Sequence, residues 1–156
     1  MYNNDGSDMK TVPLFKDEFG FLSNFYISPF NWNGFRWNTV EHAFQASKTK
    51  STYDQERIRT AGTPAIAKRL GREVELRKDW EQIKVSVMTE LVWLKFEQNS
   101  ILINMLLDTG SAELIEGNYW HDNYWGDCYC RKCMKYEGKN MLGFILMEIR
   151  QALIDG

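Results

Sequence analysis

Three polar side chains with complementary chemistry lie close together in the sequence: Glu41, Gln45 and Lys48. The pattern predicts a helix that starts at Thr39, whose side chain can accept a hydrogen bond from a free amide, and ends near residues 49–51. Seven residues turn a helix by about 700° and advance it by roughly 10 Å, so Glu41 and Lys48 share a face with Gln45 between them. An acid, an amide and an amine in one row can stabilise charge, donate hydrogen bonds and supply a nucleophile. The alternative is a solvated polar face.

A second concentration of polar and aromatic residues occupies residues 116–140. We expect residues 117–139 to form one long loop, and a long loop with many rings and carboxylates favours a functional role. A base or ribose could lie against the Trp125 indole and the backbone of Gly126, and Asp122 adds a carboxylate. The alternative is that the rings only pack the loop onto the domain.

A smaller polar and aromatic loop, residues 20–25, carries Ser23, Asn24 and Phe25. Its Ser and Asn can contact a substrate, or they can serve turn hydrogen bonds alone. Several basic residues could hold a phosphate, although solvated surface charge is the favoured alternative for each of them. These are Lys68, Arg69, Arg72 and Arg150.

The cysteines of the chain form one cluster, Cys128, Cys130 and Cys133. A C-x-C-x2-C run can place three thiolates around one tetrahedral ion, and His121 offers a fourth ligand, because structural zinc accepts three Cys and one His. The spacing differs from a standard zinc-finger pair. Reduced, unligated thiols are an equal alternative, and redox chemistry is a lesser one. An odd number of closely spaced cysteines does not indicate a secreted disulfide framework, so we expect a cytoplasmic protein.

The charge balance limits the classes of partner that we expect the chain to bind. The 156 residues include 19 Lys and Arg against 21 Asp and Glu, a net charge of −2 that is spread along the chain. The sequence has no basic stripe, which argues against strong binding to duplex DNA or to an anionic membrane but leaves an anionic small molecule open. No apolar run reaches signal-peptide or transmembrane length.

The element pattern indicates mainly helices. Asn33-Gly34 between aromatic residues predicts a hairpin over residues 31–37. Pro64 suits the first turn of a helix, and residues 79–82 (Asp-Trp-Glu-Gln) indicate a capping box at the start of the longest helix. A final helix follows from apolar residues at helical spacing over 142–153.

These elements together predict an α+β class: a mainly helical single domain with a small antiparallel sheet. We expect residues 1–10 to be frayed and residues 11–156 to form the domain.

Taken in order, these segments resemble the NADAR (YbiA-like) family, a group associated with NAD and ADP-ribose. The resemblance covers roughly residues 12–154, and it rests on motifs that are weak singly but specific in this order and spacing. The cysteine cluster is not among them. The motifs are residues 20–25, 39–48, 63–64, 95–96, 118–126, 138–143 and 145–150.

The resemblance implies a hydrolase that acts on N-glycosyl compounds without a redox cofactor. Family members hydrolyse phosphoribosyl-pyrimidine intermediates of riboflavin synthesis, and others remove ADP-ribose from guanine bases. By position, Glu41 and Lys48 match the family's catalytic helix and Asp122 matches its loop carboxylate. Asn24, Phe25, Trp125, Gly126 and Asn140 match the family's substrate-pocket motifs, and Ser23 and Gln45 are further substrate-binding candidates.

The chemistry fits these residue types. Cleavage of a C1′–N bond builds positive charge on the sugar, so a nearby carboxylate lowers the barrier, and the departing base needs a proton. Once the ribose opens, an unprotonated Lys48 can form a Schiff base with C1′. Burial would have to lower the pKa of Lys48, whereas an ionised Glu41 beside it raises that pKa. We therefore expect the two groups not to touch, or Glu41 to hold a proton.

Two alternatives come from other functional classes. A non-catalytic ADP-ribose or NAD-binding module would use the same pocket, expected as a cleft between the 41–48 helix and the 116–140 loop. The presence of Glu41, Lys48 and Asp122 argues against it. A small zinc protein that binds nucleic acid through the Cys-rich loop is disfavoured by the near-neutral charge. The sequence leaves the physiological substrate and the oligomeric state open.

Overall fold

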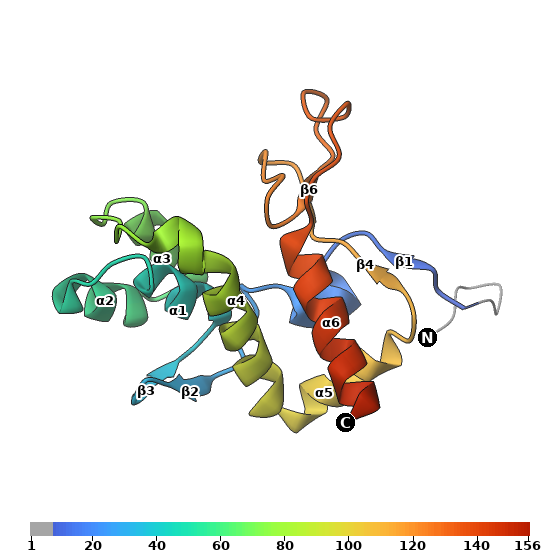
Figure 1. The fold of residues 1–156 in the computed structure, drawn as a ribbon, viewed down its shortest axis with the longest axis horizontal. Helices are drawn as coiled ribbons and strands as arrows, with labels where there is room; N and C mark the ends of the chain where they lie inside the picture. The colour runs from blue at the N-terminus through green and yellow to red at the C-terminus, as the bar shows by residue number, and fades with distance from the viewer. Residues whose placement is uncertain (1–7) are drawn as a thin grey trace. The chain divides into compact units, whose positions relative to one another are not determined.

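The computed structural model describes residues 8–156 (Figure 1). It contains two compact units: unit 2 is Asn24–Asn99, and unit 1 combines the residues up to Ser23 with Ser100–Gly156. The first seven residues of the segment expected to be frayed lie outside the described residues. In the rest of that segment, the Lys10 carbonyl accepts a hydrogen bond from the Glu113 N–H (2.9 Å). The single-domain organisation of residues 11–156 stays a prediction.

The aromatic hairpin of unit 2 is confirmed. Strand β2 (Phe30–Trp32) pairs antiparallel with β3 (Phe35–Trp37). Asn33 and Gly34 at the turn have φ angles of 51° and 80°, the left-handed pair that a two-residue type I′ turn requires.

Four helices complete unit 2: α1 (Val40–Ala46), α2 (Thr52–Arg59), α3 (Pro64–Gly71) and α4 (Trp80–Glu97). Helix α1 packs against the other three, as Figure 1 shows, and all of its residues are buried. Because α1 forms the centre of the unit, any polar group on it is held in a largely apolar, water-poor environment.

The helix starts that the sequence predicts in unit 2 are confirmed, with one exception. Thr39 and Thr63 each accept a hydrogen bond from the N–H three residues later (both 3.1 Å), and Pro64 occupies the first turn of α3, as predicted. The capping box predicted at residues 79–82 is wrong, because Asp79 makes no side-chain cap bond. Its carboxylate instead accepts two hydrogen bonds from Arg77 (2.6 and 3.0 Å).

The core of unit 1 contains two α-helices and a pair of short strands. Strand β1 (Thr11–Val12) pairs in parallel with β4 (Glu113–Leu114), and a 3-10 helix, η1 (Asp17–Leu22), follows β1. Helix α6 (Met141–Asp155) packs against β4 and against α5 (Ser100–Asp108). The fully buried apolar side chains of this core include Val12, Leu106, Leu114, Leu142 and Leu146.

The segment before α6 is not the unbroken loop that the sequence predicts. Strand β5 (Gly117–Asn118) pairs in parallel with β6 (Asp127–Cys128). In Figure 1 this segment extends beyond the N-terminal end of α6. The α+β, mainly helical class is confirmed; the β2–β3 pair is antiparallel as predicted, and the other two pairs are parallel.

Arg150 on α6 is not a solvated surface charge. It is buried, and its guanidinium donates to Thr109 Oγ1 and to the Ala112 carbonyl (both 2.8 Å), so its charge is engaged within the fold of unit 1. Across residues 8–156, no helix combines the length and the apolar character needed to span a membrane.

Candidate active site

The polar row on α1 begins with a buried acid and amide. Glu41 and Gln45 are only 7% and 4% exposed, so these two residues do not belong to a solvated face. Gln45 Nε2 donates to Glu41 Oε1 (2.8 Å). Burying a carboxylate is costly unless it is hydrogen-bonded, so this amide helps to hold the acid in place.

The other end of the Gln45 amide leaves an acceptor open. Gln45 Oε1 is buried and has no hydrogen-bond partner within the described chain. It faces Gly71 on α3 so closely that a Cβ atom on Gly71 would overlap it. Buried polar atoms are normally paired, so this unpaired acceptor keeps Gln45 a candidate for a polar contact with a substrate.

Lys48 follows α1 instead of lying on it. The helix ends at Ala46, earlier than predicted, and the Lys48 N–H donates to the Gln45 carbonyl (3.2 Å) in a tighter, 3-10-like turn. The Lys48 side chain is half-buried, with its ammonium 6.0 Å from the centroid of the Phe44 ring. The lysine therefore stays next to the acid and the amide, although the helical-face argument that placed it there does not hold.

Several charges act on Lys48. Desolvation by burial lowers its pKa, Glu41 raises it, and Lys68 and Arg72 lower it; the net shift is downward from the ordinary lysine value. A lowered pKa increases the fraction of neutral amine, which is the form that attacks a carbonyl carbon. Glu41 bonds to Gln45, and Lys48 lies near Phe44; the expectation that the acid and the amine do not touch stays a prediction.

The segment predicted as a loop over residues 20–25 begins with the end of η1, because residues 20–22 belong to that 3-10 helix, and its residue Asn24 supports the start of α1. Asn24 is buried, and its carbonyl accepts the N–H of Glu41 (3.1 Å). The ring of Phe25 is 39% exposed, and the Lys68 ammonium lies 5.8 Å from its centroid. Ser23, in unit 1, makes a turn bond: its N–H donates to the carbonyl three residues earlier (3.0 Å).

Asp122, in unit 1, organises its own loop. Its Oδ1 accepts the backbone N–H groups of Tyr124 (3.0 Å) and Trp125 (2.9 Å). Asn118 clamps the Asp122 backbone, because its side chain accepts from the N–H (3.1 Å) and donates to the carbonyl (2.7 Å). The half-buried Trp125 ring packs edge-on against Tyr124, with centroids 4.9 Å apart. The carboxylate and the indole are thus fixed relative to each other.

The same loop closes the N-terminal end of α6. The carbonyls of residues 124–126 accept hydrogen bonds from the N–H groups of residues 140–142 (3.0–3.1 Å). Asn140 is buried at φ 50°; its side chain accepts from the Glu116 N–H (3.0 Å) and donates to the Leu114 carbonyl (2.9 Å). Asn140 and Gly126, expected as substrate contacts, therefore also have clear roles in the fold of unit 1.

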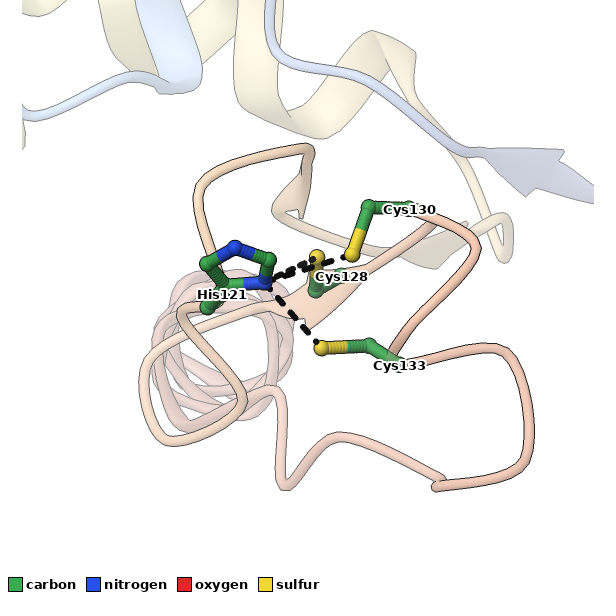
Figure 2. Close-up of side chains that lie close together, drawn as sticks. All are labelled: His121, Cys128, Cys130 and Cys133. Atoms are coloured by element: carbon green, nitrogen blue, oxygen red, sulfur yellow. Dashed lines mark hydrogen bonds between the residues drawn. The ribbon is translucent and has the colours of Figure 1, made fainter.

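The four metal-ligand candidates meet in unit 1. His121 Nδ1 lies 3.2 Å from Cys130 Sγ, 3.4 Å from Cys133 Sγ and 4.0 Å from Cys128 Sγ. Figure 2 shows the three sulfur atoms turned toward this one ring nitrogen. All four donor atoms lie within 4.8 Å of one another, and the cysteines are free. The structure thus brings together an N,S,S,S ligand set.

Lys95 is a titratable residue whose position the sequence reasoning did not assign. It is 1% exposed, and desolvation lowers its pKa to about 7. Its ammonium lies 5.7 Å from the centroid of the Tyr26 ring. Helical spacing could have found it, because Met88, Leu91 and Lys95 follow the i, i+3, i+7 pattern of the buried face of α4.

The protein has an α+β fold. At helix α1 it holds a buried acid and amide, Glu41 and Gln45, beside Lys48, whose pKa is lowered; these three residues are the α1 cluster. The sequence matches the family described as "NADAR domain" over residues 13–154. The chain belongs to the NADAR family.

Particular relatives are similar over most of this chain. "N-glycosidase YbiA" of Escherichia coli is 42% identical over 143 residues, which cover 88% of this chain and 83% of the relative. The NMR structure of E. coli YbiA matches with a TM-score of 0.80 at 38% identity, covering 94% of this chain and 86% of that one. The YbiA-like fold is therefore confirmed.

Two further relatives extend this comparison. An N-glycosidase of Nostoc punctiforme is 36% identical over 144 residues, with 86% of both chains covered. A riboflavin biosynthesis protein of Vibrio vulnificus is 40% identical over 140 residues, covering 86% of this chain but 35% of that protein. The relatives' names support N-glycosidase function, hydrolysis of N-glycosyl compounds, in the NADAR family.

Proposed function

We propose that this chain is an N-glycosidase that hydrolyses the bond between a base and a phosphorylated ribose. The observation that carries the proposal is the buried Glu41–Gln45 pair beside a lysine whose pKa is lowered. The riboflavin biosynthesis relative favours a ribosylamino-pyrimidine phosphate as the substrate over an ADP-ribosylated guanine. The closely spaced free cysteines favour the cytoplasm as the compartment.

The proposed chemistry starts with the acid. As the C1′–N bond breaks, its electron pair leaves with the base nitrogen, which takes up one proton, and the Glu41 carboxylate stabilises the positive charge at C1′. Gln45 Oε1 accepts a hydrogen bond from the substrate. Water supplies the hydroxyl group that remains on C1′, so the net reaction consumes one water.

Lys48 offers a covalent route for the same reaction. In the ring-opened ribosylamine, C1′ is an imine carbon still bonded to the base nitrogen. The neutral amine of Lys48 adds to C1′, its proton passes to the base nitrogen, and the C1′–N bond to the base breaks, which leaves a Schiff base between C1′ and Lys48. Hydrolysis of the Schiff base consumes one water and restores the amine, so the lysine is regenerated and the balance is unchanged.

The remaining site residues are proposed to complete substrate binding. In unit 2, the exposed ring of Phe25 and the adjacent Asn24 would contact the substrate. In unit 1, Asp122 would supply a second carboxylate and Trp125 a flat surface for the base. Because Asp122 also fixes its loop, the activity of an Asp122 variant has to be compared with that variant's stability.

The test incubates the purified protein with a ribosylamino-pyrimidine phosphate and, separately, with a guanine-ADP-ribosylated oligonucleotide, and chromatography then quantifies the released base or ADP-ribose. We expect Lys48→Ala to lose at least ~1,000-fold in turnover and Glu41→Gln about 100-fold or more. Lys50→Ala, an exposed lysine two residues on, serves as the matched control and should retain activity.

The outcomes separate the alternatives. Cleavage of the oligonucleotide alone would keep the N-glycosidase assignment and change the substrate. Tight binding of ADP-ribose without release of product from any substrate would contradict catalysis and support a binding module. Salt-sensitive oligonucleotide binding without cleavage would support a nucleic-acid-binding protein.

A further inference from the structure

The convergence of three sulfur atoms on one imidazole nitrogen needs a chemical explanation. Nδ1 of His121 can take part in one good hydrogen bond, either as a donor or as an acceptor. Cysteine thiols are also weak donors, so hydrogen bonding satisfies at most one of the three approaches of 3.2, 3.4 and 4.0 Å. A cation at the centre would satisfy all four donor atoms at once.

The distances fit a small tetrahedral ion. With metal–sulfur bonds of about 2.3 Å and a metal–nitrogen bond of about 2.05 Å, the edges of a tetrahedron are about 3.6 Å for N–S and about 3.8 Å for S–S. The observed N–S separations lie on both sides of the first value, and every donor pair falls within 4.8 Å. Only small side-chain adjustments are needed to close the site.

The backbone delivers the ligands from separate segments. Cys128 is placed by the β5–β6 pair and by a hydrogen bond from its N–H to Asn123 Oδ1 (2.9 Å). Cys130 and Cys133 flank a tight turn in which the Cys133 N–H donates to the Cys130 carbonyl (3.0 Å). His121 adopts a left-handed conformation, φ 70°, that is uncommon for a non-glycine residue. A ligand bond would stabilise that conformation.

The donor set selects the metal. Three thiolates and one imidazole are soft ligands that favour zinc over magnesium or calcium, which prefer oxygen. A site with four protein ligands has no open position for a substrate, which is typical of a structural ion. Three thiolates with Zn²⁺ leave one negative charge, and the intervening Arg131 and Lys132 offer compensating positive charge.

We propose that this ligand set binds one structural Zn²⁺, which fixes the loop that carries Asp122 and Trp125. The ligands are His121, Cys128, Cys130 and Cys133. The ion ties β6 to the segment directly before Asp122, so it determines the position of the loop carboxylate. The proposal is independent of N-glycosidase activity, because its evidence is the geometry of unit 1 alone.

The test measures metal content in protein expressed with added zinc and purified without chelator. We expect about one equivalent of zinc per chain in the wild type and less than about a tenth in Cys130→Ser and His121→Asn. Replacement of zinc by Co²⁺ should give the visible absorption of a tetrahedral thiolate complex. Met134→Ser changes a 73% exposed neighbour of Cys133 and is the matched control that should keep its zinc.

If the ligand variants do not fold, a second measurement on the wild-type chain tests whether its thiols bind zinc. Titration of the thiols with a mercurial reagent should release about one zinc per three thiols modified. Folded wild type with less than about a tenth of an equivalent of any transition metal, and without a cobalt spectrum, would overturn the proposal. Equal loss of zinc from Met134→Ser and Cys130→Ser would overturn the ligand assignment.

Discussion

The charge state of Lys48 determines whether the α1 cluster can act as a nucleophile. Two opposing effects meet at this amine: burial and the cations Lys68 and Arg72 lower its pKa, and Glu41 raises it. Burial is the largest of these effects. The carboxylate that we propose to stabilise positive charge on the sugar therefore also limits how much neutral amine is present.

Replacing Glu41 should shift the titration of Lys48 in a defined direction. Because Glu41→Gln removes the influence that raises the pKa of Lys48, that pKa should fall below its wild-type value, which already lies below the ordinary lysine value. Reductive ¹³C-methylation followed by NMR titration measures it directly, with the Lys48→Ala protein identifying the resonance. An upward shift in Glu41→Gln would show that Glu41 is not ionised beside the lysine.

The close approach of helices α1 and α3 positions the amide that holds Glu41. Gly71 lies against the Gln45 side chain, where a Cβ atom would overlap Oε1. Glycine inside a helix normally weakens it relative to alanine. Its presence here is explained by the space that the Gln45 side chain needs, so the packing of α1 against α3 depends on the absence of a side chain at Gly71.

Gly71→Ala should therefore destabilise the protein, opposite to the effect expected from helix propensity. Overpacking of this kind costs about 1–3 kcal/mol, and displacement of Gln45 from Glu41 should lower kcat as well. Urea unfolding followed by circular dichroism and a turnover assay measure the two effects. Gly62→Ala is the matched control, because a Cβ atom at Gly62 meets nothing within 4 Å. A stabilised, fully active Gly71→Ala protein would contradict this account of the α1–α3 contact.

Local signals in the sequence predict the elements whose causes are local. The Asn33-Gly34 turn and the Thr39 cap depend on neighbouring backbone groups, and both are confirmed. The end of α1 at Ala46 could not be predicted, because it depends on backbone geometry. The capping box predicted at Asp79 is wrong although its cause is local, because Arg77, two residues earlier, binds the carboxylate that the cap would need. The role of a residue within the fold is equally hidden when its partners are distant in the sequence.

Asn140 shows that partners distant in the sequence cannot be predicted, whereas the cysteine cluster shows that closely spaced residues can. Asn140 bonds to main-chain groups 24 and 26 residues away, which no local pattern records. The C-x-C-x2-C run identifies three ligand candidates because their spacing is short, and His121 joins them through the left-handed backbone at its own position. Chemistry-bearing residue types were therefore easier to predict than the contacts that orient them.

At the scale of the whole molecule, a buried lysine couples folding to pH. Lys95 is fully buried in unit 2, and its pKa falls to about 7 in the folded state. In the unfolded chain the same amine stays protonated up to about pH 10.4. Between these values the unfolded state binds more protons, so this group makes the free energy of unfolding rise with pH.

Lys95→Met should remove that pH dependence. Below pH 7 Lys95 is charged in both states, so the wild type bears the full free-energy cost of burying a charged amine. This cost shrinks as the pH rises above 7 and disappears above the pKa that Lys95 has in the unfolded chain. The stability of wild type relative to Lys95→Met should thus increase by on the order of a few kcal/mol between pH 7 and pH 10. Urea unfolding at several pH values measures the difference, with the exposed Lys78→Met as control. A constant difference across this range would mean that Lys95 keeps its charge inside the folded protein.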